Sequence, residues 1–202
     1  MSMRASCVFV SIIACLSSSA AFAGLSAFHA DQSAIGPITR TYTYIDDIRA
    51  NKSGLCKTIR VSGYKEQPVV QERCPAGPNG WSVTMVSADA RVNVWFGRQA
   101  QGGATVSDAL KGGFSDPHST IEWRLLSGKP FAAIQRYYFG GQQALTVHRL
   151  NDDKTSCVAA VVSVEHGLDA NAEAVRLADE IVPTFRCAYD KMIVVGHIAD
   201  PS

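Results

Sequence analysis

The chain has 202 residues, with 19 lysines and arginines against 18 aspartates and glutamates, and its formal net charge is +1. Because it has no basic stripe and no polybasic patch, neither nucleic acid nor anionic lipid is an expected partner. A chain of this length buries a sizeable core and forms one domain or two small ones.

The first residues, 1–23, predict a secretory signal peptide. Arg4 gives a positive start, an apolar run follows, and Ala21–Ala23 has the small-x-small pattern that signal peptidase reads. We expect cleavage near Ala23–Gly24 and a periplasmic or secreted protein. The apolar run is shorter than the about 20 residues of a spanning helix, so we expect no transmembrane anchor. An alternative is a lipoprotein signal, since Ile12–Cys15 loosely resembles a lipoprotein box.

The first half of the mature chain has an all-β pattern. After a loose N-terminal lead-in at 24–37, residues 38–96 form a β-rich half in which turn residues separate short alternating stretches. The predicted strands lie at 39–45, 56–61, 67–73, 81–86 and 91–96. Residues 97–118 contain five glycines and no apolar periodicity, which predicts a long Gly-rich loop with one helical turn near Val106–Lys111.

The second half, 119–202, is predicted as an antiparallel meander plus a helix. Its strands are expected at 120–126, 131–139, 144–150 and 157–164, with a further strand near the end of 185–198. A helix over about 169–182 is indicated by Asp169 as N-cap, apolar residues at helical spacing, and Pro183 as the stop. We therefore predict an α+β fold, with mostly antiparallel strands in two halves and one strong C-terminal helix on a four-stranded meander.

The most aromatic stretch is PFAAIQRYYFGG at 130–141. Both alternation sets are apolar, which favours a strand packed between two layers over an aromatic binding face. The binding alternative remains, with Arg124, Arg136 and Tyr138 as its candidate residues.

Two of the six cysteines lie in the leader and four follow it, at Cys56, Cys74, Cys157 and Cys187. An even count in an exported chain predicts disulfides, and no pair has zinc-ligand spacing. Cys56 and Cys74 are symmetric about residue 65, which lies in the SGYKEQ turn at 62–67, so a hairpin folded there places them opposite each other. A strand leading out from Cys157 and a helix leading back bring Cys187 near it.

Two segments, IEWRLLSGKPFAAIQRYY and LADEIVPTFRCAYD, resemble uncharacterised exported proteins of alphaproteobacteria. The likeness includes a cysteine hairpin ending in Arg73–Gly77 and a C-terminal element at Phe185–Ala188. The resemblance implies export and disulfides, and it implies no activity.

The strongest catalytic candidate is the set Ser115, Asp116 and His118 in the predicted loop. A serine, a histidine and an aspartate can run acyl transfer, but they must converge around an oxyanion hole, and Asp-Pro-His is also ordinary turn chemistry. Paired carboxylates of a glycosidase are a further alternative, from among Glu122, Glu165, Glu173 and Glu180. No histidine or cysteine motif predicts a metal, and no glycine pair predicts a cofactor.

A third candidate is the Ser-Gly pair before Tyr64. Lysozyme inhibitors of the periplasm present such a loop, and Ser62 and Gly63 are predicted at the tip of the disulfide hairpin. The leading prediction is a non-catalytic binding or interaction module of the cell envelope, whose partner is an envelope protein or a peptidoglycan fragment. The alternatives are a hydrolase near 97–118 and a lysozyme-inhibitor-like loop at 62–64.

Overall fold

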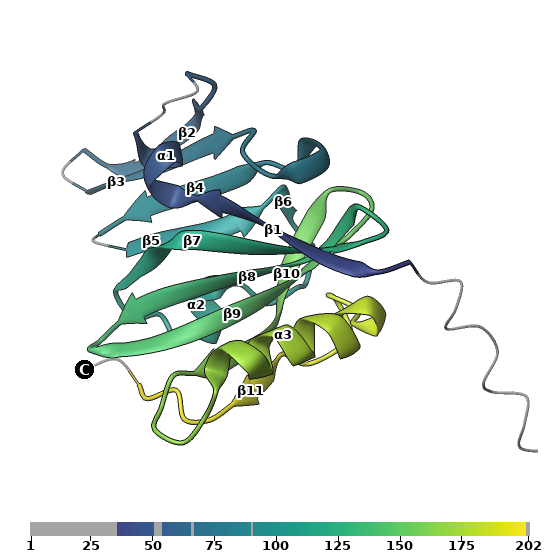
Figure 1. Ribbon diagram of the computed structural model, residues 1–202. Coiled ribbons are helices and arrows are strands. Elements are labelled where there is room, and N and C mark those ends of the chain that lie inside the picture. Colours follow the sequence, from purple (N-terminus) through teal and green to yellow (C-terminus); the bar gives the residue numbers. More distant parts are fainter. Residues whose placement is uncertain (1–35, 51–53, 66, 90, 201–202) are drawn as a thin grey trace, which may run out of the picture. The chain divides into compact units, whose positions relative to one another are not determined.

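The computed structural model describes residues 36–50, 54–65, 67–89 and 91–200 (Figure 1). The predicted signal peptide and the lead-in as far as residue 35 lie outside the described residues. The described residues belong to one unit that spans Ile35–Ser202.

Two β-sheets make up most of this unit. Sheet A has the strand order β1-β7-β8-β9-β10-β11, with β6 also paired to β10. Its strands are β1 (Ile38–Tyr44), β6 (Arg98–Gln99), β7 (Ser115–Leu126), β8 (Lys129–Phe139), β9 (Gln142–Leu150), β10 (Thr155–Ser163) and β11 (Ile193–Val195). Sheet B has the order β2-β3-β4-β5. Its strands are β2 (Lys57–Tyr64), β3 (Gln67–Cys74), β4 (Val83–Ala88) and β5 (Arg91–Phe96).

Helices connect and cover the sheets. The α-helices are α1 (Ile45–Arg49), α2 (Val106–Ala109) and α3 (Ala170–Glu180), and the 3₁₀ turns are η2 (Pro78–Gly80) and η3 (Val182–Thr184). Within the described residues, no helix has the length and apolar character needed to cross a membrane.

The predicted meander is confirmed as the antiparallel run β7-β8-β9-β10, and it is the centre of a larger sheet. The division into two halves is wrong for β1, which was assigned to the first half. This strand pairs antiparallel with β7, so Tyr42 lies opposite Glu122 and Tyr44 opposite Thr120. At the other side, β11 adds to β10 in parallel. Neither pairing partner can be deduced from alternation, since alternation fixes only which residues share a face.

The predicted loop at 97–118 is shorter and more structured than expected. It contains β6 and α2, whose first turn has a capping box between Thr105 and Asp108. Strand β7 then begins at Ser115, where Ser115, Asp116 and Pro117 pair with the end of β8. The Ser, Asp and Pro of this stretch indicated a turn, but pairing with a distant strand outweighs that local preference.

Helix α3 forms where the sequence predicted it. The Asp169 side chain accepts a hydrogen bond from the Ala172 N–H at 3.0 Å, and the helix ends before Pro183. Ala174, Leu177 and Ala178 are buried in a cluster with apolar residues of β8, β9 and β10. These alanines let the helix approach the sheet closely, and Figure 1 shows α3 lying across one face of sheet A.

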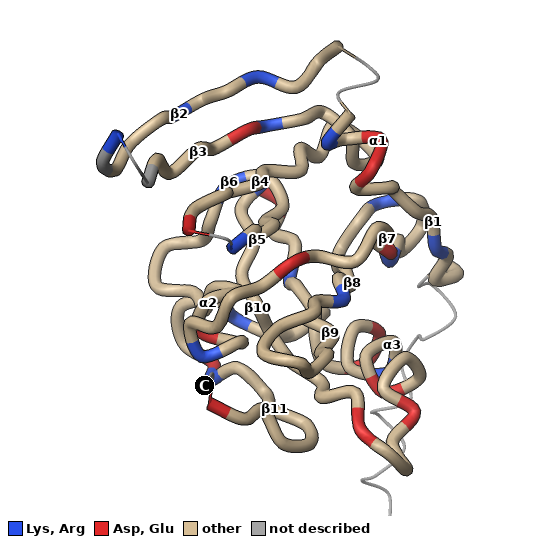
Figure 2. The backbone as a smooth tube through the Cα atoms, turned by 90° about the vertical axis from the view of Figure 1, so that its left-hand side faces the viewer, with Lys and Arg blue, Asp and Glu red and all other residues tan. Residues whose placement is uncertain are grey.

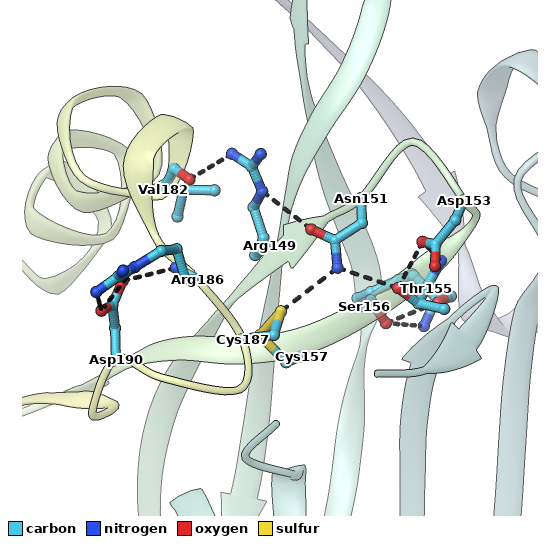
Figure 3. Close-up of a disulfide and its surroundings, with 11 residues drawn as sticks. Arg149, Asn151, Asp153, Thr155, Ser156, Cys157, Val182, Arg186, Cys187 and Asp190 are labelled. Atoms are coloured by element: carbon cyan, nitrogen blue, oxygen red, sulfur yellow. Dashed lines mark hydrogen bonds and ion pairs between the residues drawn. A yellow bond between two sulfur atoms is a disulfide. The ribbon is translucent and has the colours of Figure 1, made fainter. Parts of the chain in front are cut away.

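Both predicted disulfides are confirmed. Cys56 and Cys74 join the ends of the β2–β3 hairpin with their Cα atoms 4.1 Å apart, and Cys157 joins Cys187 at 5.7 Å. The second disulfide ties β10 to the segment after α3 (Figure 3). Beside it, the Arg149 guanidinium donates to the Val182 carbonyl at 2.6 Å, so β9 and η3 are also held together.

The main core lies between the two sheets. Ile121 and Trp123 of β7 and Tyr137 of β8 share a buried cluster with apolar residues of sheet B, and the Trp123 and Phe96 rings meet edge to face at 5.0 Å. Ala132 and Ile134 of β8 belong instead to the cluster under α3. The stretch at 130–141 is therefore mainly a strand between two layers, as predicted.

Two hydroxyl groups of sheet A hydrogen-bond to the backbone along the edge of β5, and we call this contact the seal of β5. The Tyr137 hydroxyl accepts the Val94 N–H at 2.9 Å, while the Ser156 hydroxyl accepts the Phe96 N–H at 3.3 Å and donates to the Phe96 carbonyl at 2.6 Å. Burial raises the pKa of Tyr137, so its hydroxyl stays neutral. Strand β5 therefore ends sheet B inside the protein without leaving these backbone groups unpaired.

Replacement of Tyr137 by phenylalanine tests this seal. Tyr137→Phe leaves the buried Val94 N–H without its acceptor, so we expect the free energy of unfolding to fall by about 1–3 kcal/mol. Tyr138→Phe is the matched control, since that side chain is 42% exposed and its hydroxyl makes no hydrogen bond within the described residues. Urea denaturation of both variants measures the difference, and equal stability of the two would contradict the seal.

His148 is buried in the same core. One ring nitrogen lies 3.0 Å from the Thr146 hydroxyl, and the ring meets Phe96 edge to face at 4.8 Å. Burial lowers the pKa of His148 from 6.5 to about 3. The folded protein therefore holds this imidazole neutral at pH values where the unfolded chain binds a proton.

This histidine predicts a loss of stability in mild acid. The free energy of unfolding, as far as it depends on His148, is highest above pH 6.5 and falls as the pH drops from 6.5 to about 3. The slope is about 1.4 kcal/mol per pH unit, so the cost between pH 6.5 and pH 5 is about 2 kcal/mol. We expect His148→Gln to be less stable than wild type at neutral pH but to lose less stability on acidification. Urea titrations at the two pH values check this, and parallel losses in both proteins would refute it.

Candidate functional site

The structure sets Ser115 apart from Asp116 and His118, the other two predicted catalytic residues. Ser115 and Asp116 point to opposite faces of β7, and Ser115 is buried, with its hydroxyl donating to the Asn93 side chain at 3.2 Å. Asp116 is exposed and pairs with Arg49 at 2.6 Å. His118 Nδ1 accepts the Thr120 N–H at 3.3 Å. None of these contacts brings a base to a nucleophile, which acyl transfer requires.

Arg124 holds helix α3 on the sheet. Its guanidinium donates two hydrogen bonds to Asp179, at 2.9 and 2.5 Å, and one to Glu122 at 2.9 Å. Burial opposes the charge, but the hydrogen bonds and charges of these carboxylates outweigh burial and raise the pKa of Arg124. Arg124 is 8% exposed, so the structure places it in a clamp under the helix.

Arg136 has a related position further along the same face. It donates to the Gln143 side chain at 3.0 Å and to Asn171 at 2.9 Å, which joins β8 to β9 and to the first turn of α3. Tyr138 is the exposed member of the aromatic stretch, and its ring lies 5.9 Å from His118. The structure thus brings Asp116, His118 and Tyr138 together on the outer face of sheet A.

The Ser-Gly pair is not at the tip of its hairpin. Ser62 pairs with Val69 and Gly63 with Pro68, so both lie within β2. The strand continues to Tyr64, and the turn falls at Lys65. The predicted position of the pair was wrong because three more residues than expected, Ser62, Gly63 and Tyr64, pair with β3 before the turn.

The predicted carboxylates are mostly engaged in ion pairs. Glu122 pairs with Arg124, and Glu173 and Glu180 both pair with Arg176 on α3. Glu165 lines an open polar cleft of about 360 Å³ with Gln142, Gln143, Ser163 and His197 among its walls. Within the described residues, no group of three or more histidine, cysteine, aspartate or glutamate side chains could hold a metal ion.

A second open cleft, which we name the β1 cleft, has a volume of about 350 Å³. Its walls are Tyr42–Tyr44 of β1, Asp47 and Ile48 of α1, the Cys56–Cys74 disulfide, and Pro75–Ala76. Tyr42 and Tyr44 alternate along β1 and are 43% and 54% exposed. The cleft therefore has two exposed tyrosines among its lining residues, together with small apolar and polar residues, a composition that is common in ligand sites.

The walls of the β1 cleft are fixed by contacts from three directions. The Thr43 hydroxyl donates to the Ala76 carbonyl at 2.9 Å and accepts the Trp123 indole N–H at 2.9 Å. Ile45 and Ile48 anchor α1 in the core between the sheets. Because the disulfide closes the opposite wall, little ordering entropy is expected when a ligand binds.

Few features of the amino-acid sequence indicated this cleft. Residues 39–45 were predicted as a strand, but nothing indicated that β1 leaves the first half and lies beside the Cys56–Cys74 disulfide. Helix α1 was also missed, although Ile45 and Ile48 have helical spacing and Asp46 and Asp47 favour a helix start.

Comparison with protein-family models, with curated proteins and with solved structures gave no match.

The hydrolase alternative can be tested directly by substituting residues of the predicted catalytic set. We expect Asp116→Ala combined with His118→Ala to cost less than about 1 kcal/mol, because the Arg49–Asp116 pair is exposed. Arg124→Ala is the contrasting variant, and its buried clamp makes a larger loss the expected result. Urea denaturation measures both. If the wild type hydrolysed an ester, amide or glycoside substrate and the double variant did not, a hydrolase would be favoured.

Proposed function

We propose that this protein is an exported, non-catalytic binding module of the cell envelope, and that the β1 cleft is its binding site. Export is inferred from the leader sequence, and the two disulfides accord with an oxidising compartment. The observation that carries the proposal is the pair of exposed tyrosines, Tyr42 and Tyr44, in a cleft with rigid walls.

The proposed ligand is a peptidoglycan fragment. Sugar rings have apolar C–H faces that stack on aromatic side chains, and their hydroxyls bond to polar groups at the ring edges. The open cleft of about 350 Å³ is at the small end of the range for ligand sites, which suits one or two rings of a longer chain.

The hydrolase and lysozyme-inhibitor alternatives have less support. The hydrolase needs a nucleophile beside a base, and Ser115 hydrogen-bonds to Asn93 on the core side of β7. The inhibitor loop needs a protruding Ser-Gly pair, and Ser62 and Gly63 lie within β2.

Tyrosine substitutions in the cleft test the proposal. We expect Tyr42→Ala with Tyr44→Ala to weaken binding of a soluble disaccharide-tetrapeptide from peptidoglycan at least tenfold, since stacking on each ring is worth about 1 kcal/mol. Tyr189→Ala is the matched control, because Tyr189 is 80% exposed and lies outside the cleft. Calorimetric titration of the mature protein measures the affinities. Unchanged binding in the double variant would refute the assignment of the cleft.

A further inference from the structure

The two edges of sheet B are treated differently by the fold. At one edge, the Val94 and Phe96 amides of β5 donate to buried hydroxyls of sheet A. At the other edge, β2 pairs with β3 on one side, and the described residues provide no strand on its other side. Strand β2 therefore offers a row of backbone donors and acceptors to a further strand.

The exposed residues of β2 are suited to such pairing. Ile59 and Val61 are 43% and 65% exposed, although β-branched residues favour the interior of a sheet. The pairing register with β3 shifts between Thr58 and Arg60, which leaves Ile59 as an extra residue. From Arg60 to Tyr64 the ladder with β3 is regular, so this part of the strand is an even template.

The hairpin also carries four basic side chains. Lys57, Arg60, Lys65 and Arg73 make no ion pair within the described residues, and Figure 2 shows basic residues on both strands. Lys57 lies directly opposite Arg73 across the ladder, an arrangement that destabilises a sheet. The buried Arg73 Nε also has no hydrogen-bond partner.

From these observations, we propose that β2 is a docking edge for an extended acidic segment of a partner protein, which adds to sheet B as a fifth strand. Carboxylates of the segment neutralise Arg60 and the Lys57–Arg73 pair, and its apolar residues cover Val61. This surface is separate from the β1 cleft and does not depend on the ligand assigned there.

Charge decides between a partner protein and a second copy of this chain. Two β2 edges brought together would place Lys57 and Arg60 of one copy near the same cations of the other. That repulsion disfavours self-pairing, whereas an acidic segment gains from the same charges. Strand addition obtains affinity from backbone hydrogen bonds and selectivity from the alternate side chains.

A pair of synthetic peptides tests the proposal. The first is a fluorescein-labelled octapeptide that alternates Glu and Val, and the second has Lys in place of Glu. Fluorescence anisotropy with the disulfide-bonded mature protein at low salt should show binding of the first peptide and at least tenfold weaker binding of the second. Added salt should weaken binding, because the charges involved are exposed. Equal affinity for the two peptides would overturn the proposal.

Variants locate the site and control for general charge. Arg60→Glu should weaken binding of the Glu/Val peptide at least tenfold, while Lys191→Glu, at an exposed position of the C-terminal segment, should change it less than twofold. The peptide should also slow hydrogen exchange of β2 amides and leave β1 amides unaffected. Unchanged affinity of Arg60→Glu, or protection away from β2, would overturn the assignment. Dimers that form without peptide and protect β2 would identify a second copy as the occupant and overturn the choice of partner.

Discussion

The contact between the β5 edge and the face of sheet A is the constraint on which the two-sheet arrangement depends. A strand edge that ends inside a protein leaves N–H groups that need acceptors, and here Tyr137 and Ser156 supply them. These two hydroxyls come from β8 and β10, so the seal depends on how the strands of the second half are placed in sheet A. The Trp123–Phe96 contact and the buried His148 ring then fill the space beside the seal.

The opposite face of sheet A is closed by a different kind of contact. Small residues of α3 allow close packing over β8, β9 and β10, and the Arg124–Asp179 pair fixes the helix near β7. The Cys157–Cys187 disulfide and the bond from Arg149 to Val182 hold the chain after the helix. Sheet A is thus covered on both sides at its centre, whereas β1 at its edge is exposed along most of its length. The exposed tyrosines lie there, so the covering of the sheet determines where a binding site can form.

Sheet B extends away from this covered centre. Its inner strand is sealed, whereas its outer hairpin has an edge that no strand of the described residues covers, and its cations make no ion pair there. The Cys56–Cys74 disulfide holds the base of that hairpin and also forms a wall of the β1 cleft. One covalent bond therefore stiffens two surfaces, and a ligand at either one meets a backbone that is already ordered.

The sequence by itself determined the elements whose signals are local. Alternating or continuously apolar stretches between turn residues predicted the four central strands. Asp169 and Pro183 marked the limits of α3, and the cysteine spacing with strand and helix lengths predicted both disulfides. It also predicted that 130–141 is mainly core, since both faces of that strand are apolar. Only the tertiary structure decided that β1 pairs with β7, that Ser115 points inward while Asp116 points outward, and that Arg124 and Arg136 hold α3. Those outcomes depend on which distant strand lies alongside, and a period of two residues does not specify the neighbouring strand. The β1 cleft was therefore beyond sequence analysis, because its walls come from segments that only this pairing brings together.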